Sequence, residues 1–240
     1  MNLIVDVGNT LIKLAVFKND VIEFYSSTKK EELELTLNEI KSEYLSIKKG
    51  ILSSVGSFDD QSVFQFFNFP FINLNHHLKF PFKNRYTTPK TLGVDRLALV
   101  SAAAMHYPNE DVLVIDAGTC VTFDFLNSKN EYLGGAISPG LRLRYKSLND
   151  FTANLPLLPT ESPKEIVGDS TANSIHSGVV FGVVNEIKGA ITQYEKQYPG
   201  LTVILTGGDS EFLSKQLKNG IFATSNFLLE GLNFILEYNS

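Results

Sequence analysis

An internal repeat is the feature of the sequence that most restricts the fold. Leu113 to Thr119 (LVIDAGT) repeats the pattern of Leu3 to Asn9 (LIVDVGN): in both, an apolar run ends in Asp-x-Gly and a further extended run follows. A duplicated unit decides the architecture before any single motif is interpreted. We therefore expect two similar halves that face each other across a cleft, each opening with a strand that ends at an aspartate.

The first copy of the repeat predicts a strand, a tight turn and a returning strand. Gly8 and Asn9 tolerate φ > 0, and Asp6 lies at the mouth of the turn. The backbone N–H groups of Gly8, Asn9 and Thr10 can converge there on an anion, and a carboxylate beside such donors suits a magnesium-bound polyphosphate. The same residues are also typical of an ordinary β-hairpin, so this stretch alone leaves both interpretations open.

The pattern along the chain predicts a mixed α/β organisation in each half. We expect strands at 2–7, 11–17, 21–26, 50–55, 71–74, 112–116, 120–126, 132–137 and 201–206. We expect helices at 31–44, 59–68, 97–106, 141–148, 211–217 and 226–238, and a long helix that begins at Ser170 or Thr171. Hairpins combined with crossover units imply mixed sheets covered by helices. The repeat favours an N-terminal domain of residues 1–92 and a C-terminal domain of residues 93–240.

Composition and charge exclude several classes of protein. With 43% apolar residues the chain can form a packed core, and no run approaches the length of a membrane span. A net charge of −5, with dispersed Lys and Arg, argues against nucleic acid as a partner. Met1 leads directly into the first strand and leaves no room for a targeting segment, so we expect a soluble, cytoplasmic protein. The single cysteine, Cys120, is expected to be a small core residue without a catalytic role.

Several familiar sites are absent from the sequence. No Gly-x-Gly-x-x-Gly follows a strand, no Gly-x4-Gly-Lys-Ser/Thr or Gly-x-Ser-x-Gly occurs, and the four histidines lack the spacing of a zinc site. What remains is carboxylates at strand ends and glycine-containing turns.

Two of these positions each allow two interpretations. Asp95 stands at the start of an alanine-rich helix, either as a cap or first-turn acid or as a carboxylate that projects into the cleft. Gly207-Gly208 after a buried strand fits a nucleotide ring lying on the backbone, or a plain strand-to-helix turn. Thr171, at the start of the expected long helix, fits a helix cap.

Five motifs in a fixed order resemble those of the type III pantothenate kinase family. They are Asp6-Val7-Gly8-Asn9-Thr10 with Lys13, Gly93-Val94-Asp95-Arg96, Asp116-Ala117-Gly118-Thr119, Gly134 to Gly140, and Thr206-Gly207-Gly208. The resemblance spans nearly the whole chain and implies the duplicated ribonuclease H-like (actin-like ATPase) fold that actin, sugar kinases and acetate kinase share. Leu11 departs from the pattern, because many family members carry a polar residue there.

The resemblance implies transfer of the ATP γ-phosphoryl group to the primary hydroxyl of pantothenate, the step that opens coenzyme A synthesis. Asp95 would be the catalytic base. A monovalent cation, K⁺ or NH₄⁺, would lie at Asp116, and the protein would be a homodimer. The residues implied to bind ATP with Mg²⁺ are Asp6, Val7, Gly8, Asn9, Thr10, Leu11, Ile12, Lys13 and Thr119, and those implied to bind pantothenate are Tyr86, Gly93, Val94, Asp95, Arg96 and Thr171.

Other functions remain open at this level. A different small-molecule kinase of the superfamily would keep the ATP hairpins and change the acceptor. An ATP-binding accessory factor for transcription would bind the nucleotide without transferring phosphate, and the presence of Asp6, Asp95 and Asp116 together argues for an enzyme instead. A structural actin-like module is disfavoured because the chain is short and lacks large insertions for filament contacts.

Overall fold

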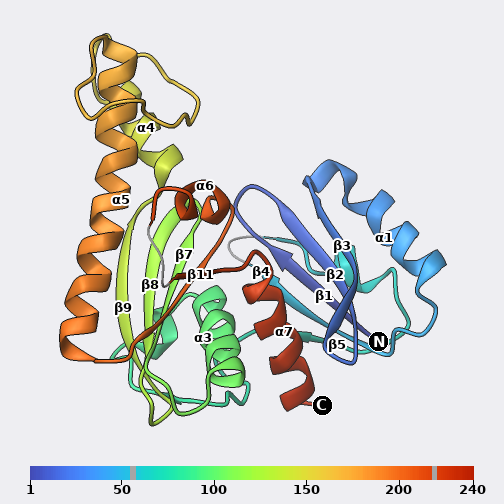
Figure 1. Cartoon of the computed structure of the whole chain (residues 1–240). Helices are drawn as coiled ribbons and strands as arrows, with labels where there is room; N and C mark the ends of the chain where they lie inside the picture. Colours follow the sequence, from blue (N-terminus) through green and yellow to red (C-terminus); the bar gives the residue numbers. More distant parts are fainter. Residues whose placement is uncertain (55–57, 218–220) are drawn as a thin grey trace. The chain divides into compact units, whose positions relative to one another are not determined.

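The computed structural model describes residues 1–54, 58–217 and 221–240, and the chain divides into two compact units (Figure 1). Unit 1 comprises Met1–Pro108, Asn130–Tyr132 and Asn226–Ser240, and unit 2 comprises Asn109–Lys129 and Leu133–Ser225. Both units are discontinuous in sequence. The predicted division after residue 92 concerns the two copies of the repeat and stays a prediction, as does their arrangement about a common cleft.

Unit 1 is built on a five-stranded mixed sheet in the order β3-β2-β1-β4-β5. β2 pairs antiparallel with both β1 and β3, whereas β4 runs parallel to both β1 and β5. Asn19 and Asp20 close the β2–β3 hairpin with φ of 48° and 64°. The predicted strand 50–55 is observed up to Ser54, and Val55 lies outside the described residues. The strands are β1 (Asn2–Val7), β2 (Ile12–Lys18), β3 (Val21–Thr28), β4 (Lys49–Ser54) and β5 (Phe71–Asn73).

Helices cover both faces of this sheet. Successive side chains of a strand point to opposite faces, so a strand that is buried throughout, such as β1, needs cover on both. Leu3 and Val5 of β1 pack into one core with Leu37 of α1 (Leu33–Glu43). On the opposite face, Asn2 donates a hydrogen bond of 2.7 Å to Asn233 of α7 (Phe227–Tyr238). The remaining elements of unit 1 are η1 (Lys30–Glu32), α2 (Gln61–Phe64), η2 (Pro89–Thr91), α3 (Val94–His106) and β6 (Lys83–Asn84), which pairs with the first residues of β9.

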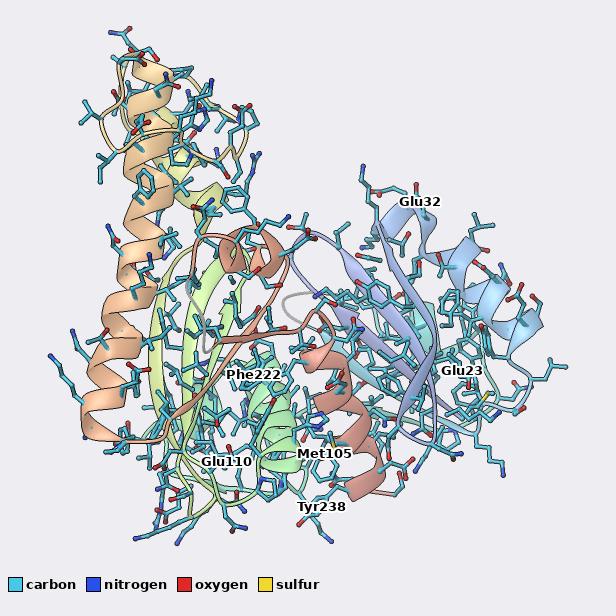
Figure 2. All side chains as sticks on the ribbon, in the orientation of Figure 1. Glu23, Glu32, Met105, Glu110, Phe222 and Tyr238 are labelled. Carbon is cyan, nitrogen blue, oxygen red and sulfur yellow. The ribbon has the colours of Figure 1, made fainter. Side chains whose placement is uncertain are left out.

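The helices α3 and α7 pack closely because α7 carries a glycine at their contact. A Cβ atom at Gly231 would lie 2.0 Å from the carbonyl oxygen of Ala98, so only glycine allows this approach. Figure 2 labels Met105 on α3 and Tyr238 on α7, near the C-terminal ends of the pair. At the same end Glu237 accepts hydrogen bonds from Asn2 (2.7 Å) and Lys49 (2.9 Å), which ties the last turn of α7 to β1 and β4.

Unit 2 repeats this topology with the strand order β11-β10-β7-β8-β9. β7 pairs antiparallel with β8 and parallel with β10, as β1 pairs with β2 and β4. The repeat predicted from the sequence is therefore confirmed, and the chain has the duplicated ribonuclease H-like fold with two mixed sheets. The strands are β7 (Val112–Ala117), β8 (Cys120–Leu126), β9 (Glu131–Pro139), β10 (Thr202–Thr206) and β11 (Ile221–Ala223).

Two helices of unit 2 pack on one face of its sheet. The α4 helix (Leu141–Asp150) and the long α5 helix (Thr171–Gln197) share a core with alternate residues of β7 and β8, and α6 (Ser210–Ser214) follows β10. Ser170 caps α5, since its hydroxyl accepts a hydrogen bond of 3.2 Å from the N–H of Asn173. The N-terminal part of α5, α4 and the loop 151–170 project beyond the sheet (Figure 1).

The predicted elements differ from the observed ones in three ways. The α3 helix begins at Val94 instead of Leu97, with Gly93 as its N-cap. Its first turn therefore includes Val94, Asp95 and Arg96. The α2 helix covers only Gln61–Phe64 of the predicted 59–68, since the phenylalanines that follow pack separately onto the core of unit 1. The short strands β6 and β11 have no sequence signal. Of the helices that the structure describes, none is both long and apolar enough to cross a membrane.

Candidate functional site

A row of three polar side chains crosses the sheet of unit 1 where β1 ends. In the register of β1 with its neighbours, Asp6 pairs with Lys13 of β2 and with Ser53 of β4. Directly paired residues on adjacent strands lie on the same face of a sheet. Because Val5 and Leu52 point into the core beneath α1, the row faces the other side, which α3 and α7 cover. Lys13, Asp6 and Ser53 thus form a row across three strands, which we call the Lys–Asp–Ser row.

Asp6 is the electrostatic centre of this row. Burial raises the pKa of its carboxyl from 3.8 to about 6, against the opposing effects of Lys13 and of the Ser53 hydroxyl, and the charge of Asp95 raises it further. A buried carboxylate whose charge is poorly compensated is suited to receive a cation. Ser53 is 0% exposed, and among the described residues its hydroxyl has no partner in hydrogen-bonding geometry, although it lies near enough to Asp6 to affect the pKa.

Asp95 lies in the first turn of α3, which confirms its interpretation as a first-turn acid, while its projection into a cleft stays a prediction. Its Oδ1 accepts a hydrogen bond of 2.9 Å from the N–H of Arg96, which stabilises the helix start. It is also close enough to Asp6 to act on its pKa. Gly93 makes room for the carboxylate, because a Cβ atom there would lie 2.3 Å from Oδ1 of Asp95. The position of the carboxylate thus depends on Gly93.

Arg96 and Tyr86, both predicted to bind the acceptor, are in contact. The Arg96 guanidinium is buried and lies over the Tyr86 ring, 5.7 Å from its centroid. Tyr86 in turn stacks on Tyr132, with centroids 6.1 Å apart. Unit 1 therefore brings Tyr86 together with the segment Gly93–Arg96, and Asp95 of this segment with Asp6.

The loop between β1 and β2 differs from the predicted tight turn. It runs from Gly8 to Leu11, and neither Gly8 nor Asn9 has a positive φ, because this longer loop reverses the chain with ordinary backbone angles. The Gly8 N–H donates to the carbonyl of Leu11 at 3.1 Å, so the amides that the loop can offer to an anion are those of Asn9 and Thr10. The expected convergence of three amides was wrong for Gly8. Val7 and Ile12 are buried, and the Leu11 side chain is 40% exposed.

In unit 2, Asp116 occupies the position that Asp6 has in unit 1. It is the penultimate residue of β7, in register with Thr122 of β8 and Thr206 of β10. Gly207 adopts φ 94°, and a Cβ atom there would lie 2.3 Å from Oδ1 of Asp116 and 2.4 Å from the carbonyl oxygen of Ala117. The carboxylate and carbonyl oxygens gathered here are ligands of the kind that hard cations prefer.

Thr119 lies in the short turn between β7 and β8. The N–H of Gly118 donates to the carbonyl of Cys120 at 2.9 Å, and the Thr119 side chain is exposed. Gly140 packs against this turn, since a Cβ atom at Gly140 would lie 2.2 Å from the carbonyl oxygen of Gly118. Gly135 likewise approaches the backbone of Phe123 at a distance no side chain allows, as glycines within a strand often do.

Thr171 opens α5 and lines a cavity of about 670 Å³ in unit 2. The helix cap is Ser170, so the interpretation of Thr171 as the cap was wrong. The cavity lies between α4 and α5, and its apolar wall contrasts with the polar groups of Thr171, Ser174 and Arg144. The apolar residues of the wall are Leu148, Leu155, Ile175 and Val179.

The donor groups of unit 1 fit a magnesium ion that arrives with a nucleotide. In the described part of the chain no three His, Cys, Asp or Glu side chains cluster as a metal site. Mg²⁺ commonly uses only one or two carboxylates and completes its shell with phosphate oxygens and water. Asp6 with the buried Ser53 hydroxyl provides such a partial site. Sequence reasoning missed Ser53, although a hydroxyl residue directly after the apolar run Gly50-Ile51-Leu52 was visible.

Solved structures share the fold of this protein. A conserved Campylobacter jejuni protein, titled as a proposed Baf family transcriptional activator, matches with a TM-score of 0.66 and 22% identity, covering 99% of this chain and 98% of that one. Glucokinase from an Antarctic psychrotroph matches with a TM-score of 0.51 and 14% identity, covering 98% of each chain. These likenesses show the fold: the chain has the duplicated fold that such kinase structures share, as the five motifs implied.

Among proteins with this fold, the chain belongs to the type III pantothenate kinase family. The sequence profile of this family matches residues 2–193. A type III pantothenate kinase of Christiangramia forsetii is 51% identical over 241 residues, which cover 100% of this chain and 99% of the relative. The family resemblance that the five motifs predicted is confirmed, and the protein is a phosphotransferase.

Proposed function

We propose that the protein transfers the γ-phosphoryl group of ATP to pantothenate, giving 4'-phosphopantothenate in the first step of coenzyme A biosynthesis. The family membership supports the substrate pair, and the placement of Asp95 in unit 1 supports the chemistry. The observation that carries the proposal is the proximity of two carboxylates with different environments. Asp6 is buried at a strand end and Asp95 is held at a helix start, so one can face a cation and the other an acceptor hydroxyl.

In this proposal Asp95 orients the primary hydroxyl of pantothenate and accepts its proton. The hydrogen bond from Arg96 N–H to Oδ1 fixes the carboxylate, and we assign Oδ2 to the substrate hydroxyl. Phosphoryl transfer depends mainly on positioning and on neutralising charge. Lys13, beside Asp6 on β2, supplies positive charge for the phosphates. Magnesium, when bound with ATP, would neutralise phosphate charge, and Asp6 would hold it.

We assign the segment Asp6 to Lys13 and Thr119 to ATP, and Tyr86, Gly93 to Arg96 and Thr171 to pantothenate. A guanidinium such as that of the buried Arg96 can make a paired hydrogen bond to a carboxylate, and we assign it to the pantothenate carboxylate or amide. Asp116, whose carboxylate lies against Gly207 beside the carbonyl oxygen of Ala117, is assigned to a monovalent cation, K⁺ or NH₄⁺. A cytoplasmic location stays a prediction.

We also assign a homodimer, which exposed apolar side chains on unit 2 support. Phe151, Ile166 and Val167 of the loop between α4 and α5 are 87%, 70% and 78% exposed. Exposed apolar side chains gathered in one segment are typical of an interaction surface. The loop adjoins the cavity that Thr171 lines, so a second copy seated there would lie near a residue assigned to the substrate.

A role as an ATP-binding accessory factor for transcription is the second candidate, because the C. jejuni structure carries that kind of title. Such a protein needs to bind ATP but has no need of an acceptor base. The retention of Asp95 with its supporting glycine, together with Asp6 and Asp116, favours the kinase.

The deciding experiment is an ATP-dependent assay with pantothenate, sugars or acetate as the sole acceptor, in potassium and in a large organic cation. We expect ADP release and 4'-phosphopantothenate with pantothenate alone, and lower activity when potassium is replaced. ADP release with a sugar and not with pantothenate would identify a different kinase. ATP binding without any transfer would identify the accessory factor, and equal rates in the two cations would remove the assignment of Asp116.

A further inference from the structure

Ser53 is a buried polar residue of unit 1 that the proposed mechanism does not yet use. Its side chain is 0% exposed, and its Oγ has no hydrogen-bond partner among the described residues. Buried hydroxyl groups are nearly always paired, because an unmade hydrogen bond is a net loss of stability. Ser53 therefore needs a partner that comes into hydrogen-bonding geometry when the protein works.

The register of the sheet identifies where this partner lies. Ser53 is directly paired with Asp6 across the parallel β1–β4 ladder, on the same face of the sheet. Its neighbours in sequence do not share this position: Leu52 points into the opposite core, and Ser54 pairs with Val7, a residue of that same core. The hydroxyl also lowers the pKa of Asp6, which places it near the carboxylate in electrostatic terms.

The second copy of the repeat shows the same pairing. Asp116, the penultimate residue of β7, is directly paired with Thr206 of the neighbouring parallel strand β10, and the Thr206 side chain is 2% exposed. In both units, then, the aspartate near the end of the first strand has a buried hydroxyl residue beside it on the next parallel strand. The sequence repeat does not include Ser53 or Thr206, so this agreement is an independent observation.

We propose that Ser53 is a positioning residue, whose hydroxyl donates to the Asp6 carboxylate and holds it in the orientation that accepts the magnesium ion of Mg·ATP. This inference rests on the proposed function for its reaction but not for its binding test. A hydroxyl that holds one carboxylate oxygen leaves the other directed to the cation or to its bound water. Orientation of this kind strengthens binding of the metal complex without contributing to binding of the bare nucleotide.

The test is binding of ADP by calorimetry, with Mg²⁺ and with EDTA, to the wild type and to Ser53→Ala, Ser53→Thr and Ser54→Ala. Ser53→Thr keeps the hydroxyl and adopts the residue type of the equivalent position in unit 2. Ser54→Ala removes a neighbouring hydroxyl from the opposite face. We expect Ser53→Ala to lose about 10- to 100-fold of the Mg²⁺-dependent gain in affinity, while Ser53→Thr and Ser54→Ala keep it.

A thermal melt of the ligand-free variants separates positioning from structure. The inference places the hydrogen bond from Ser53 to Asp6 in the nucleotide-bound state, so Ser53→Ala without ligand is expected to melt no lower than the wild type. A clearly lower melting temperature, or an equal loss of affinity with and without Mg²⁺, would overturn the inference. So would an unchanged Mg²⁺-dependent gain in Ser53→Ala.

Turnover with pantothenate distinguishes this inference from the proposed function. In Ser53→Ala we expect the apparent KM for Mg·ATP to rise about 10- to 100-fold, with the KM for pantothenate unchanged. If the wild type does not phosphorylate pantothenate at all, the proposed function fails, and the calorimetric comparison still decides the role of Ser53.

Discussion

Single residues at the start of α3 decide where the proposed base lies. Asp95 is held by the N–H of Arg96 and by the absence of a side chain at Gly93. The carboxylate is half-buried, so it can be changed without opening the core. Its contribution to turnover can thus be separated from its contribution to folding.

Asp95→Asn is expected to fold normally and to lose about 10²- to 10⁴-fold in turnover, because the amide cannot accept the hydroxyl proton. Steady-state kinetics with pantothenate and a thermal melt measure the two effects. Turnover near that of the wild type would exclude Asp95 as the base.

Gly93→Ala tests the position of the Asp95 carboxylate without changing Asp95 itself. The new methyl group would lie 2.3 Å from Oδ1 of Asp95, and the flexible carboxylate is expected to move aside while the backbone stays in place. A displacement of about 1 Å lowers turnover by about 10- to 100-fold, with little change in melting temperature. The control is Gly189→Ala in the exposed part of α5, where a Cβ atom meets nothing within 4 Å and turnover should not change.

Asp6 couples stability to pH in the ligand-free protein. Its folded pKa of about 6 lies above the ordinary 3.8, so the protonated carboxyl favours the folded state. This contribution is complete below pH 3.8 and is lost as the pH rises through about 6, by about 3 kcal/mol at most. Asp6→Asn removes the dependence and should be more stable than the wild type at pH 8, with the difference shrinking toward pH 4.

Urea unfolding of both proteins across this pH range, without nucleotide, provides the measurement. The same variant is expected to lose Mg·ATP binding, because the neutral amide does not hold the cation. An identical pH dependence in the two proteins would show that Asp6 is not the group responsible.

At the scale of elements, glycines determine how closely backbones approach. Gly231 on α7 sits against the carbonyl of Ala98 on α3, whereas Gly189 on α5 has open space around it. Both are interior residues of helices, so helix propensity affects them alike. The difference in stability between alanine substitutions at Gly231 and at Gly189 therefore measures the effect of packing.

Gly231→Ala is expected to destabilise the protein by about 1–3 kcal/mol, because the methyl group must push the two helices apart. Gly189→Ala should stabilise it by about 0.5–1 kcal/mol through helix propensity. Urea unfolding of the pair measures both changes. Two shifts of the same sign would contradict the packing argument.

The elements that sequence reasoning predicted are those with a strong pattern. The apolar runs of β1 and β7 and the periodic α5 were correctly identified, since each carries its signal over many residues. The strands β6 and β11 were missed because two- and three-residue strands depend on a neighbour for their existence. The motif aspartates of the candidate site were visible in sequence, but the pairing of Ser53 with Asp6 was not, because the register of β1 with β4 joins residues far apart in the chain.

At the scale of the whole molecule, the exposed apolar loop of unit 2 predicts self-association. Replacing both Phe151 and Val167 by Asp is expected to shift the protein from dimer to monomer in sedimentation velocity, because charges would have to be buried at the contact. Leu45→Asp is the matched control, since Leu45 is 84% exposed on unit 1. A monomeric wild type, or an equal effect of the control, would contradict the proposed homodimer.

The order in which the chain contributes to unit 1 restricts how the enzyme can be made. The face of the sheet that bears Asp6 is covered partly by α7, which comes from the last residues of the chain and is bonded to Asn2 and Lys49 near its beginning. A nascent chain whose α7 residues are still in the ribosome exit tunnel lacks this cover, so β1 and β4 wait for a helix that is synthesised much later. Unit 1 is therefore completed only after α7 has left the ribosome, and loss of α7 by proteolysis removes the support of β1 and β4.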